Sequence, residues 1–371
     1  MAGPLTSLKV IEFSGLGPGP LAGQLLADLG ADVIAVDRVT AAPDPTDINR
    51  RGKRSVALDL KLSQGRTIAR HLLSDADILI EGFRPGVMEK LGLGPSDCPE
   101  TLIYGRMTGW GQDGPLAQTA GHDINYLALS GVLSMIGPAD LPPTPPLNLI
   151  GDYGGGTMFL LFGLLAAVIE RGVSGKGQVV DAAMIDGVPA MMGLLHALQA
   201  RGIWEETRAR NWLDGGAPFY RCYTCACGGV IAVGALEPQF FAELVEKAGL
   251  DDDMKGQNDK RTWQSRTEHY AAVFARRSRA DWMQIFDGSD ACVAPVLSTR
   301  EAADHPQNVA RAVFADVDGV LQANPAPRFS RSVPADPKSP GGMGAETDAI
   351  LGGLGYTAAE IGDMRDVGVL K

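Results

Sequence analysis

Long apolar segments and paired cysteines are scarce in this 371-residue sequence. Residues 1–6 lack the charged start of a secretory leader, and the longest apolar run, 157–169, has only 13 residues. Spanning a bilayer core of ~30 Å takes about 20, so we expect no membrane contact and interpret the run as a buried helix. The cysteines are odd in number, which favours free thiols in a reducing compartment. They are Cys98, Cys222, Cys225, Cys227 and Cys292.

Positive charge is also in deficit. There are 33 Lys and Arg residues against 44 Asp and Glu, a net charge of -11. Nucleic acid is therefore not an expected partner, because phosphate binding needs a basic face.

No internal repeat is visible, and the final residues, GVLK, are not a peroxisomal signal, so we expect a cytoplasmic protein. What is present, 45% hydrophobic and 21% charged residues, is typical of a globular chain large enough for two domains.

The order of strand-like and helix-like segments indicates an α/β fold. Strands are predicted at 8–13, 31–36, 55–60, 76–83, 101–109 and 177–184, with helix-like segments between most of them. From about residue 218 the pattern changes to paired strands followed by helices. We expect a large domain at 1–190 and 328–371, a small domain at 218–312, and linkers at 191–217 and 313–327.

The loop after the first predicted strand resembles a dinucleotide-binding turn. Gly17, Gly19 and Ala22 fit the G-x-G-x-x-A spacing, and Asp37 follows where such a fold reads a ribose hydroxyl. Pro18 and Pro20 argue against this interpretation, because proline has no backbone N–H and the turn holds pyrophosphate through backbone N–H groups.

Basic residues are unevenly distributed despite the acidic total. Arg50, Arg51, Lys53 and Arg54 lie within eight residues, and Lys61, Arg84, Lys90 and Arg106 follow at or near the ends of later predicted strands. Such clustering at strand ends predicts a polyanionic ligand across the edge of the sheet. A solvated basic loop explains the first cluster equally well.

Two segments contain residues suited to proton transfer. His122 begins a predicted helix, beside backbone N–H groups that can hold an oxyanion, although Asp123 could simply cap that helix while His122 packs. Asp152 precedes three glycines and the apolar run, where a ligand could approach closely; it could equally be an N-cap in a tightly packed helix.

Two further features have weaker chemical interpretations. Glu237, before Pro238, could orient an imidazole, but an ordinary first-turn glutamate explains it as well. Cys222, Cys225 and Cys227 invite a zinc site, yet no second ligand pair has suitable spacing. We expect no metal.

Together, several segments resemble the family III CoA-transferase superfamily, and within it the members that epimerise 2-methylacyl-CoA thioesters. The likeness runs nearly end to end. It implies a Rossmann-like large domain, a smaller α+β domain and an interlocked homodimer. The segments are DLGADVIAVDR, RGKRSVALDLK, DILIEGFRPGVMEKLGLG, YGRMTGWGQDGPLAQTAGHDINYLALSG, LNLIGDYGGGTMFLLFGLLAA, GGAPFYRCYTC with GGVIAVGALEPQFF, and ETDAILGGLGY.

The resemblance implies which residues act. His122 and Asp152 would remove and return the α-proton on opposite faces, and Glu237 would sit beside His122, supplied by the second subunit of a homodimer with shared sites. No cofactor is implied, because coenzyme A is part of the substrate. The residues implied to bind it are Arg38, Leu58, Asp59, Leu60, Lys61, Gly82, Phe83, Arg84, Gly121, Asp123, Ile124, Asn125 and Tyr126.

The same superfamily offers an alternative. Its true CoA-transferases use an aspartate at the position of Asp152 to attack the thioester and form an acyl-enzyme anhydride. They usually have tyrosine at the position of His122. A histidine there supplies a second proton-transfer group, which favours the epimerase.

Overall fold

The computed structural model describes residues 3–42 and 44–371. The chain divides into two compact units, the first being Met1–Ser130, Leu147–Met191 and Ala312–Lys371, and the second Gly131–Pro146 and Met192–Arg311. The Pro-rich segment 131–146, expected in the large domain, thus groups with the second unit. So does 192–217, which we expected to be a linker, whereas 313–327 groups with the first unit.

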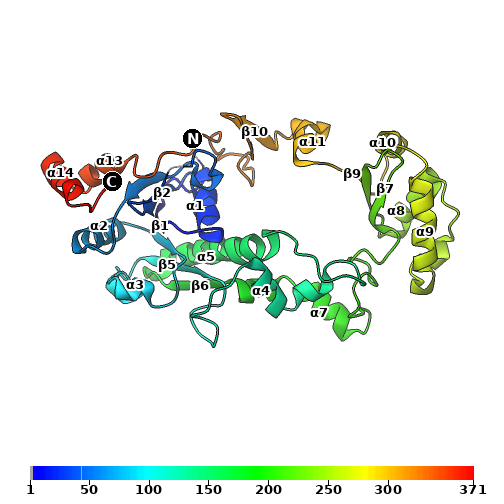
Figure 1. The fold of residues 1–371 in the computed structure, drawn as a ribbon, viewed down its shortest axis with the longest axis horizontal. Coiled ribbons are helices and arrows are strands. Elements are labelled where there is room, and N and C mark those ends of the chain that lie inside the picture. The colour runs from blue at the N-terminus through cyan, green and yellow to red at the C-terminus, as the bar shows by residue number, and fades with distance from the viewer. Residues whose placement is uncertain (1–2, 43) are drawn as a thin grey trace. The chain divides into compact units, whose positions relative to one another are not determined.

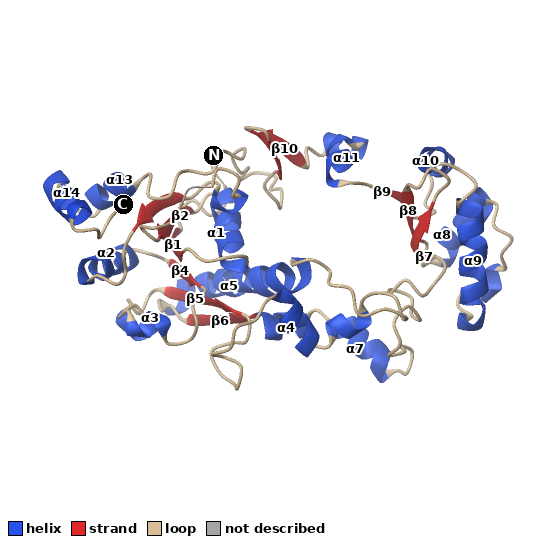
Figure 2. Ribbon diagram, viewed as in Figure 1, coloured by secondary structure: helices blue, strands red, loops and turns tan. Residues whose placement is uncertain are grey.

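A six-stranded parallel sheet forms the centre of the first unit, in the order β3-β2-β1-β4-β5-β6 (Figures 1 and 2). Each predicted strand overlaps one of these strands. The order reverses between β1 and β4, and crevices at the carboxyl ends of strands beside such a reversal are where open α/β sheets bind ligands. The strands are β1 (Lys9–Phe13), β2 (Asp32–Asp37), β3 (Arg54–Ala57), β4 (Ile78–Glu81), β5 (Ile103–Thr108) and β6 (Val179–Ala183).

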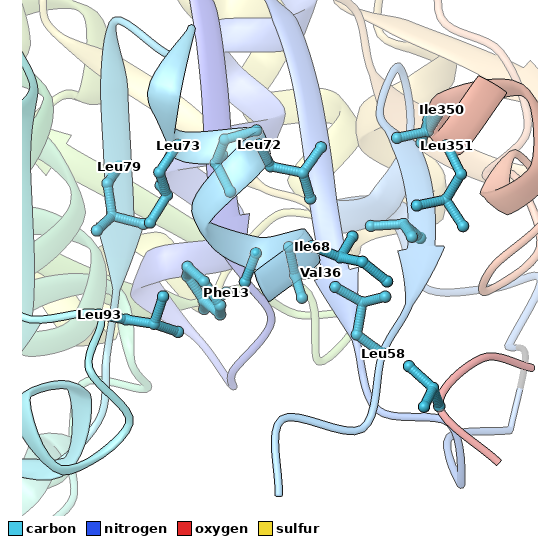
Figure 3. Packing of buried hydrophobic residues seen from close by; sticks show 14 of the residues in the cluster. Phe13, Val36, Leu58, Ile68, Leu72, Leu73, Leu79, Leu93, Ile350 and Leu351 are labelled. Carbon is cyan, nitrogen blue, oxygen red and sulfur yellow. The ribbon is translucent and has the colours of Figure 1, made fainter. Parts of the chain in front are cut away.

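Helices cover both faces of this sheet, and strand side chains alternate between two hydrophobic clusters. One cluster packs α2, α13 and α14 against the strands, with Ile68, Leu72, Ile350 and Leu351 prominent in Figure 3. The other packs α1 and α5. The helices are α1 (Pro18–Asp28), α2 (Ser63–Ser74), α3 (Val87–Lys90), α4 (Asp123–Leu129), α5 (Phe159–Ser174), α6 (Met184–Ala190), α13 (Thr347–Gly353) and α14 (Ala358–Asp366), with a β10 (Phe314–Val317) and β11 (Val320–Ala323) hairpin.

The apolar run 157–169 is helical, as predicted, but the prediction that this helix is buried was wrong. A π-helix, η4 (Leu149–Met158), continues directly into α5, giving 26 helical residues that contain an 18-residue stretch with a mean hydropathy of 1.6. Among the described residues, this helix alone is long and apolar enough to cross a membrane by length and composition. It buries Leu160 and Leu164 but leaves Phe162 76%, Ile169 75% and Val173 89% exposed.

The second unit has its own core. The antiparallel sheet β7-β8-β9 packs one face against an aromatic-rich cluster that includes Phe219, Phe241, Tyr270 and Trp282. Its elements are α7 (Gly193–Ala200), β7 (Tyr220–Thr224), β8 (Val230–Gly234), α8 (Pro238–Ala248), α9 (Trp263–Phe274), α10 (Arg279–Phe286), β9 (Val293–Val296), α11 (Thr299–Asp304) and α12 (Pro306–Ala310).

The basic cluster at 50–54 forms ion pairs inside the protein, so neither predicted interpretation of it holds. Four different carboxylates neutralise its four cations, and the pairs of Arg50, Arg51 and Lys53 are buried. These charges are not available to a polyanion, nor is the loop a solvated one. The pairs are Arg50–Asp37, Arg51–Asp28, Lys53–Glu12 and Arg54–Asp32.

The Arg50–Asp37 pair leads to a stability prediction. Asp37 accepts hydrogen bonds from Arg50 at 2.9 and 2.6 Å and from Ser55 Oγ at 2.5 Å, and its side chain is 1% exposed. Asp37→Asn leaves a buried guanidinium without its counter-charge, so we expect a loss of about 3 kcal/mol in the free energy of unfolding in urea. Asp32→Asn breaks the half-exposed Arg54 pair and should cost less than about 1 kcal/mol. Equal losses would contradict the assignment.

Candidate active site

A cavity of about 750 Å³ lies at the carboxyl ends of β1, β4 and β5, beside the point where the strand order reverses. Its lining includes the glycine-rich turn 14–20, the loop 82–85, the segment 107–110 and residues 117 and 119–122. His122 and Asp152 both contribute to the lining. The fold therefore brings the two predicted proton-transfer residues, 30 positions apart in the sequence, to one cavity.

The glycine-rich turn approaches the carboxylate of Asp152. Gly17 has φ +71°, which favours glycine, and a Cβ there would lie 3.5 Å from Asp152 Oδ2. The turn is fixed to η4 by Thr157, whose Oγ1 donates to the Pro18 carbonyl at 2.9 Å. Asp37 is held inside the protein by Arg50 and Ser55. The turn thus lies beside an acid rather than forming a pyrophosphate cradle, and Asp37 is not placed to read a ribose.

His122 is the N-cap residue of α4, with extended backbone and an exposed side chain. Its backbone N–H donates to Asn125 Oδ1 at 3.0 Å, which sets where the helix begins. The Asn125 N–H donates to the His122 carbonyl at 2.8 Å, whereas the N–H groups of Asp123 and Ile124 have no preceding carbonyl of α4 to bond. The imidazole therefore stands next to backbone donors that can hold a developing negative charge.

Asp152 lies in the first turn of η4, so the N-cap interpretation was wrong; the N-cap residue is Asn148. The backbone N–H of Asp152 donates to Asp123 Oδ2 at 2.7 Å, and Asp123 is only 8% exposed. A Cβ on Gly151 would lie 2.5 Å from the same oxygen, so glycine at 151 is what allows the contact. Asp123 thereby joins the start of α4 to the start of η4. This contact fixes the position of Asp152 relative to His122.

The glycines after Asp152 serve helix packing, as the alternative interpretation predicted. A Cβ on Gly155 would lie 2.7 Å from Val188 Cγ2, and a Cβ on Gly187 would lie 1.9 Å from the Gly155 carbonyl oxygen. Helix α6 therefore packs directly on the backbone of η4. Because π-helical turns recur at functional sites in other proteins, the position of Asp152 on such a turn is consistent with a chemical role.

The environment of Asp152 makes its proton harder to lose. Burial raises the pKa of its carboxyl group first, and the negative charge of Asp123 raises it further, while Asn148 and His122 act in the opposite direction. A carboxyl group with a raised pKa holds a proton more readily near neutral pH. Asp152 is therefore suited to give a proton as well as to take one.

Two aromatic rings form another wall of the cavity. Trp110 and Tyr126 meet edge to face with ring centroids 4.7 Å apart. Gly109 makes room for this, since a Cβ there would lie 2.0 Å from Tyr126 Cζ. Burial, together with the charges of Asp152 and Asp123, raises the pKa of the Tyr126 hydroxyl, so the ring stays neutral beside the acid.

The residues implied to bind coenzyme A follow the carboxyl ends of β2, β3 and β4 or begin α4. Arg38, Gly82, Phe83, Arg84, Gly121 and Tyr126 line the cavity. The remaining ones, Leu58, Asp59, Leu60, Lys61, Asp123, Ile124 and Asn125, lie outside its lining. Within residues 3–42 and 44–371, the exposed side chains of Arg38, Lys61 and Arg84 make no hydrogen bond or ion pair. These three cations, unlike those of the 50–54 cluster, are free to meet phosphates.

Glu237 belongs to the second unit. It is the exposed N-cap residue of α8, and its side chain makes no capping hydrogen bond. A carboxylate that neither caps nor pairs within its own helix is available to another partner.

The cysteines show no metal-binding arrangement. All five are free; Cys225 is buried, whereas Cys222 and Cys227 are exposed. Across the described part of the chain, no group of three or more His, Cys, Asp or Glu side chains is arranged to hold a metal ion.

The sequence did not predict the roles of two residues of this site, Asp123 and Trp110. Asp123 was considered as a helix cap or a ligand contact, but it accepts the Asp152 N–H instead. Trp110 was not singled out at all. A conspicuous signal was available for Trp110, since it follows a predicted strand directly and is flanked by Gly109 and Gly111.

The fold and this site define an α/β protein with a cavity beside the point where the strand order reverses. The chain belongs to CoA-transferase family III, whose model matches residues 5–342. It is 46% identical to mouse (Mus musculus) alpha-methylacyl-CoA racemase, and the alignment covers 96% of this chain and 95% of the mouse protein. The human (Homo sapiens) alpha-methylacyl-CoA racemase is 43% identical, with 99% and 97% covered.

A solved structure has the same fold. It is a CAIB/BAIF family protein from Brucella suis, 25% identical in sequence, with a TM-score of 0.80 over 95% of this chain and 100% of that one. The predicted family and fold class are therefore confirmed.

Proposed function

We propose that this protein is a racemase of 2-methylacyl-CoA thioesters, interconverting the (R) and (S) epimers. One observation carries the proposal: His122 and Asp152, two side chains able to exchange protons, line a single cavity in a chain 46% identical to a protein named as such a racemase. Epimerisation needs a proton acceptor on one face of the α-carbon and a proton donor on the other.

The geometry supports a two-step exchange. Either His122 or ionised Asp152 takes the α-proton, depending on which epimer is bound, and the electron pair moves into the thioester carbonyl to give an enolate. The proposed donors to the enolate oxygen are the unbonded backbone N–H groups at the start of α4, next to His122. The other group then returns a proton to the opposite face. Because these two proton transfers balance without a redox step, we propose no cofactor.

Exposed apolar side chains support a homodimer. Phe162, Ile169 and Val173 lie on one helix, α5, and are each at least 75% exposed. Large exposed apolar patches mark interaction sites. We propose that a second copy of the chain covers this face and that Glu237 of each copy acts beside His122 of the other.

Deuterium incorporation tests the proposed activity. Incubating one pure 2-methylacyl-CoA epimer with the protein in deuterium oxide should place deuterium at C2 and yield both epimers, with no acceptor acid added. A transferase using Asp152 as nucleophile would instead move coenzyme A only when a free carboxylic acid is supplied. Acid-dependent transfer without exchange at C2 would overturn the racemase proposal.

A further inference from the structure

The loop that carries Arg84 is fixed at both ends by one guanidinium group. It runs from the end of β4 at Glu81 to α3, which contains Glu89. Arg106 on β5 is the strand partner of Glu81, with Nε 3.7 Å from Glu81 Oε1, and its Nη2 also bonds Glu89. A third contact, from Nη1 to Gln112 Oε1 at 2.6 Å, holds the guanidinium in place.

Glu81 also holds the loop backbone directly. Its Oε2 accepts the Phe83 N–H at 2.7 Å, and the residue is 3% exposed. Burial raises the pKa of Glu81 to about 7, against the opposing effects of the Phe83 N–H and Arg106; the charges of Glu89 and Asp181 raise it further. A buried acid group beside a charged partner at the edge of a cavity is typical of functional sites.

Two neighbours complete the constraint on the loop. The Phe83 ring packs edge-on against Phe13 with centroids 6.5 Å apart, and Gln118 Nε2 donates to the Pro85 carbonyl at 3.0 Å. Thus Phe83 and Pro85, on either side of Arg84, are tied to other elements. Arg84 itself is exposed and, within the described residues, lacks a side-chain partner.

We propose that Glu81 is a positioning residue for coenzyme A: with Arg106 it pre-orders the 82–85 loop so that Arg84 meets a phosphate of the ligand. The inference rests on the proposed acyl-CoA substrate. Pre-ordering a cationic side chain strengthens binding because less conformational freedom is lost when the ligand arrives. Glu81 touches neither the ligand nor the reacting atoms in this role, so it acts through Arg84.

Calorimetric titration with coenzyme A tests the inference independently of epimerisation. Glu81→Gln should raise the Kd for coenzyme A about tenfold, and Arg84→Ala should do so by a similar factor. The double variant should bind no worse than Arg84→Ala alone, within about twofold, because the two residues act as one unit. In the racemase assay, Glu81→Gln should raise KM by about the same factor with kcat within about twofold.

Asp77→Asn is the matched control. Asp77 directly precedes β4, at the opposite end of the same strand, and likewise accepts a backbone N–H, from Lys9 at 2.9 Å, and an arginine, Arg171, at 2.7 Å. Its Kd for coenzyme A should equal that of the wild type. Additive losses in the double variant, or wild-type affinity in Glu81→Gln, would overturn the positioning role. If the wild-type protein binds coenzyme A tightly but epimerises no 2-methylacyl-CoA thioester, the proposed function is overturned and the positioning role of Glu81 is not.

Discussion

Replacing Asp152 by Asn is expected to stop inversion at C2 while leaving hydrogen exchange intact for one epimer only. Asn cannot accept or return the proton, so interconversion should fall by roughly 10²–10⁴-fold. His122 still faces one side of the α-carbon. In deuterium oxide, the epimer deprotonated by His122 should therefore exchange with retention, and the other should not exchange.

His122→Ala should show the mirror-image pattern, with exchange confined to the opposite epimer. NMR of the C2 position, combined with chiral separation of the products, measures both quantities. Loss of exchange for both epimers in either variant would show that a single group handles both protons, contrary to the two-base assignment.

The raised pKa of Asp152 adds a pH dependence with a definite sign. In the direction where Asp152 is the base, it must be ionised, so activity falls as pH drops through its pKa. Burial and Asp123 place that fall at a higher pH than for an ordinary aspartate. Asp348→Asn is the control: this aspartate pairs with Arg365, lies outside the cavity lining and should leave the profile unchanged.

Heterodimers that combine two inactive chains are expected to recover about half of the wild-type activity. One chain has His122→Ala and the other Glu237→Ala, and each variant alone should lose roughly 10²-fold. If each site takes His122 from one chain and Glu237 from the other, one site of the heterodimer contains both substitutions and the second is intact.

Co-expression with two different affinity tags isolates the heterodimer for this assay. Activity no higher than that of the single variants would mean that Glu237 serves His122 of its own chain, or that it does not act at this site. A mixture of the two separately purified homodimers is the control, and it gives the background without exchange of chains.

The parallel sheet was predictable because each of its six strands lies in a short apolar run bounded by turn residues. Parallel strands buried on both faces have this form, and the predicted ranges overlap all six strands. The exposure of α5 was not predictable. An apolar run shows that a helix avoids water, but which of its faces the same chain covers depends on neighbours such as β5 and β6, which pack on Leu160 and Leu164.

The partners of charged residues were equally hidden in the sequence. Arg50 and Asp37 are 13 positions apart, and Lys53 and Glu12 are 41 apart. Glu12 lies on β1 and Asp37 on β2, and the fold of the segment leading into β3 brings Lys53 and Arg50 to them. Clustering of positive charge selected Arg84, which lines the cavity, but it also selected cations already neutralised by internal carboxylates.

The C-terminal segment has a consequence for how the protein is made. Glu346 accepts the Ser55 N–H at 2.8 Å, and Leu370 pairs with Leu58, so residues 346–370 complete the packing around β3. On the ribosome, residues 192–311 of the second unit emerge before these contacts exist. The second unit can therefore complete its fold first. The nascent first unit keeps an uncovered apolar face until residues 346–370 emerge, and chaperone protection matters most during that interval.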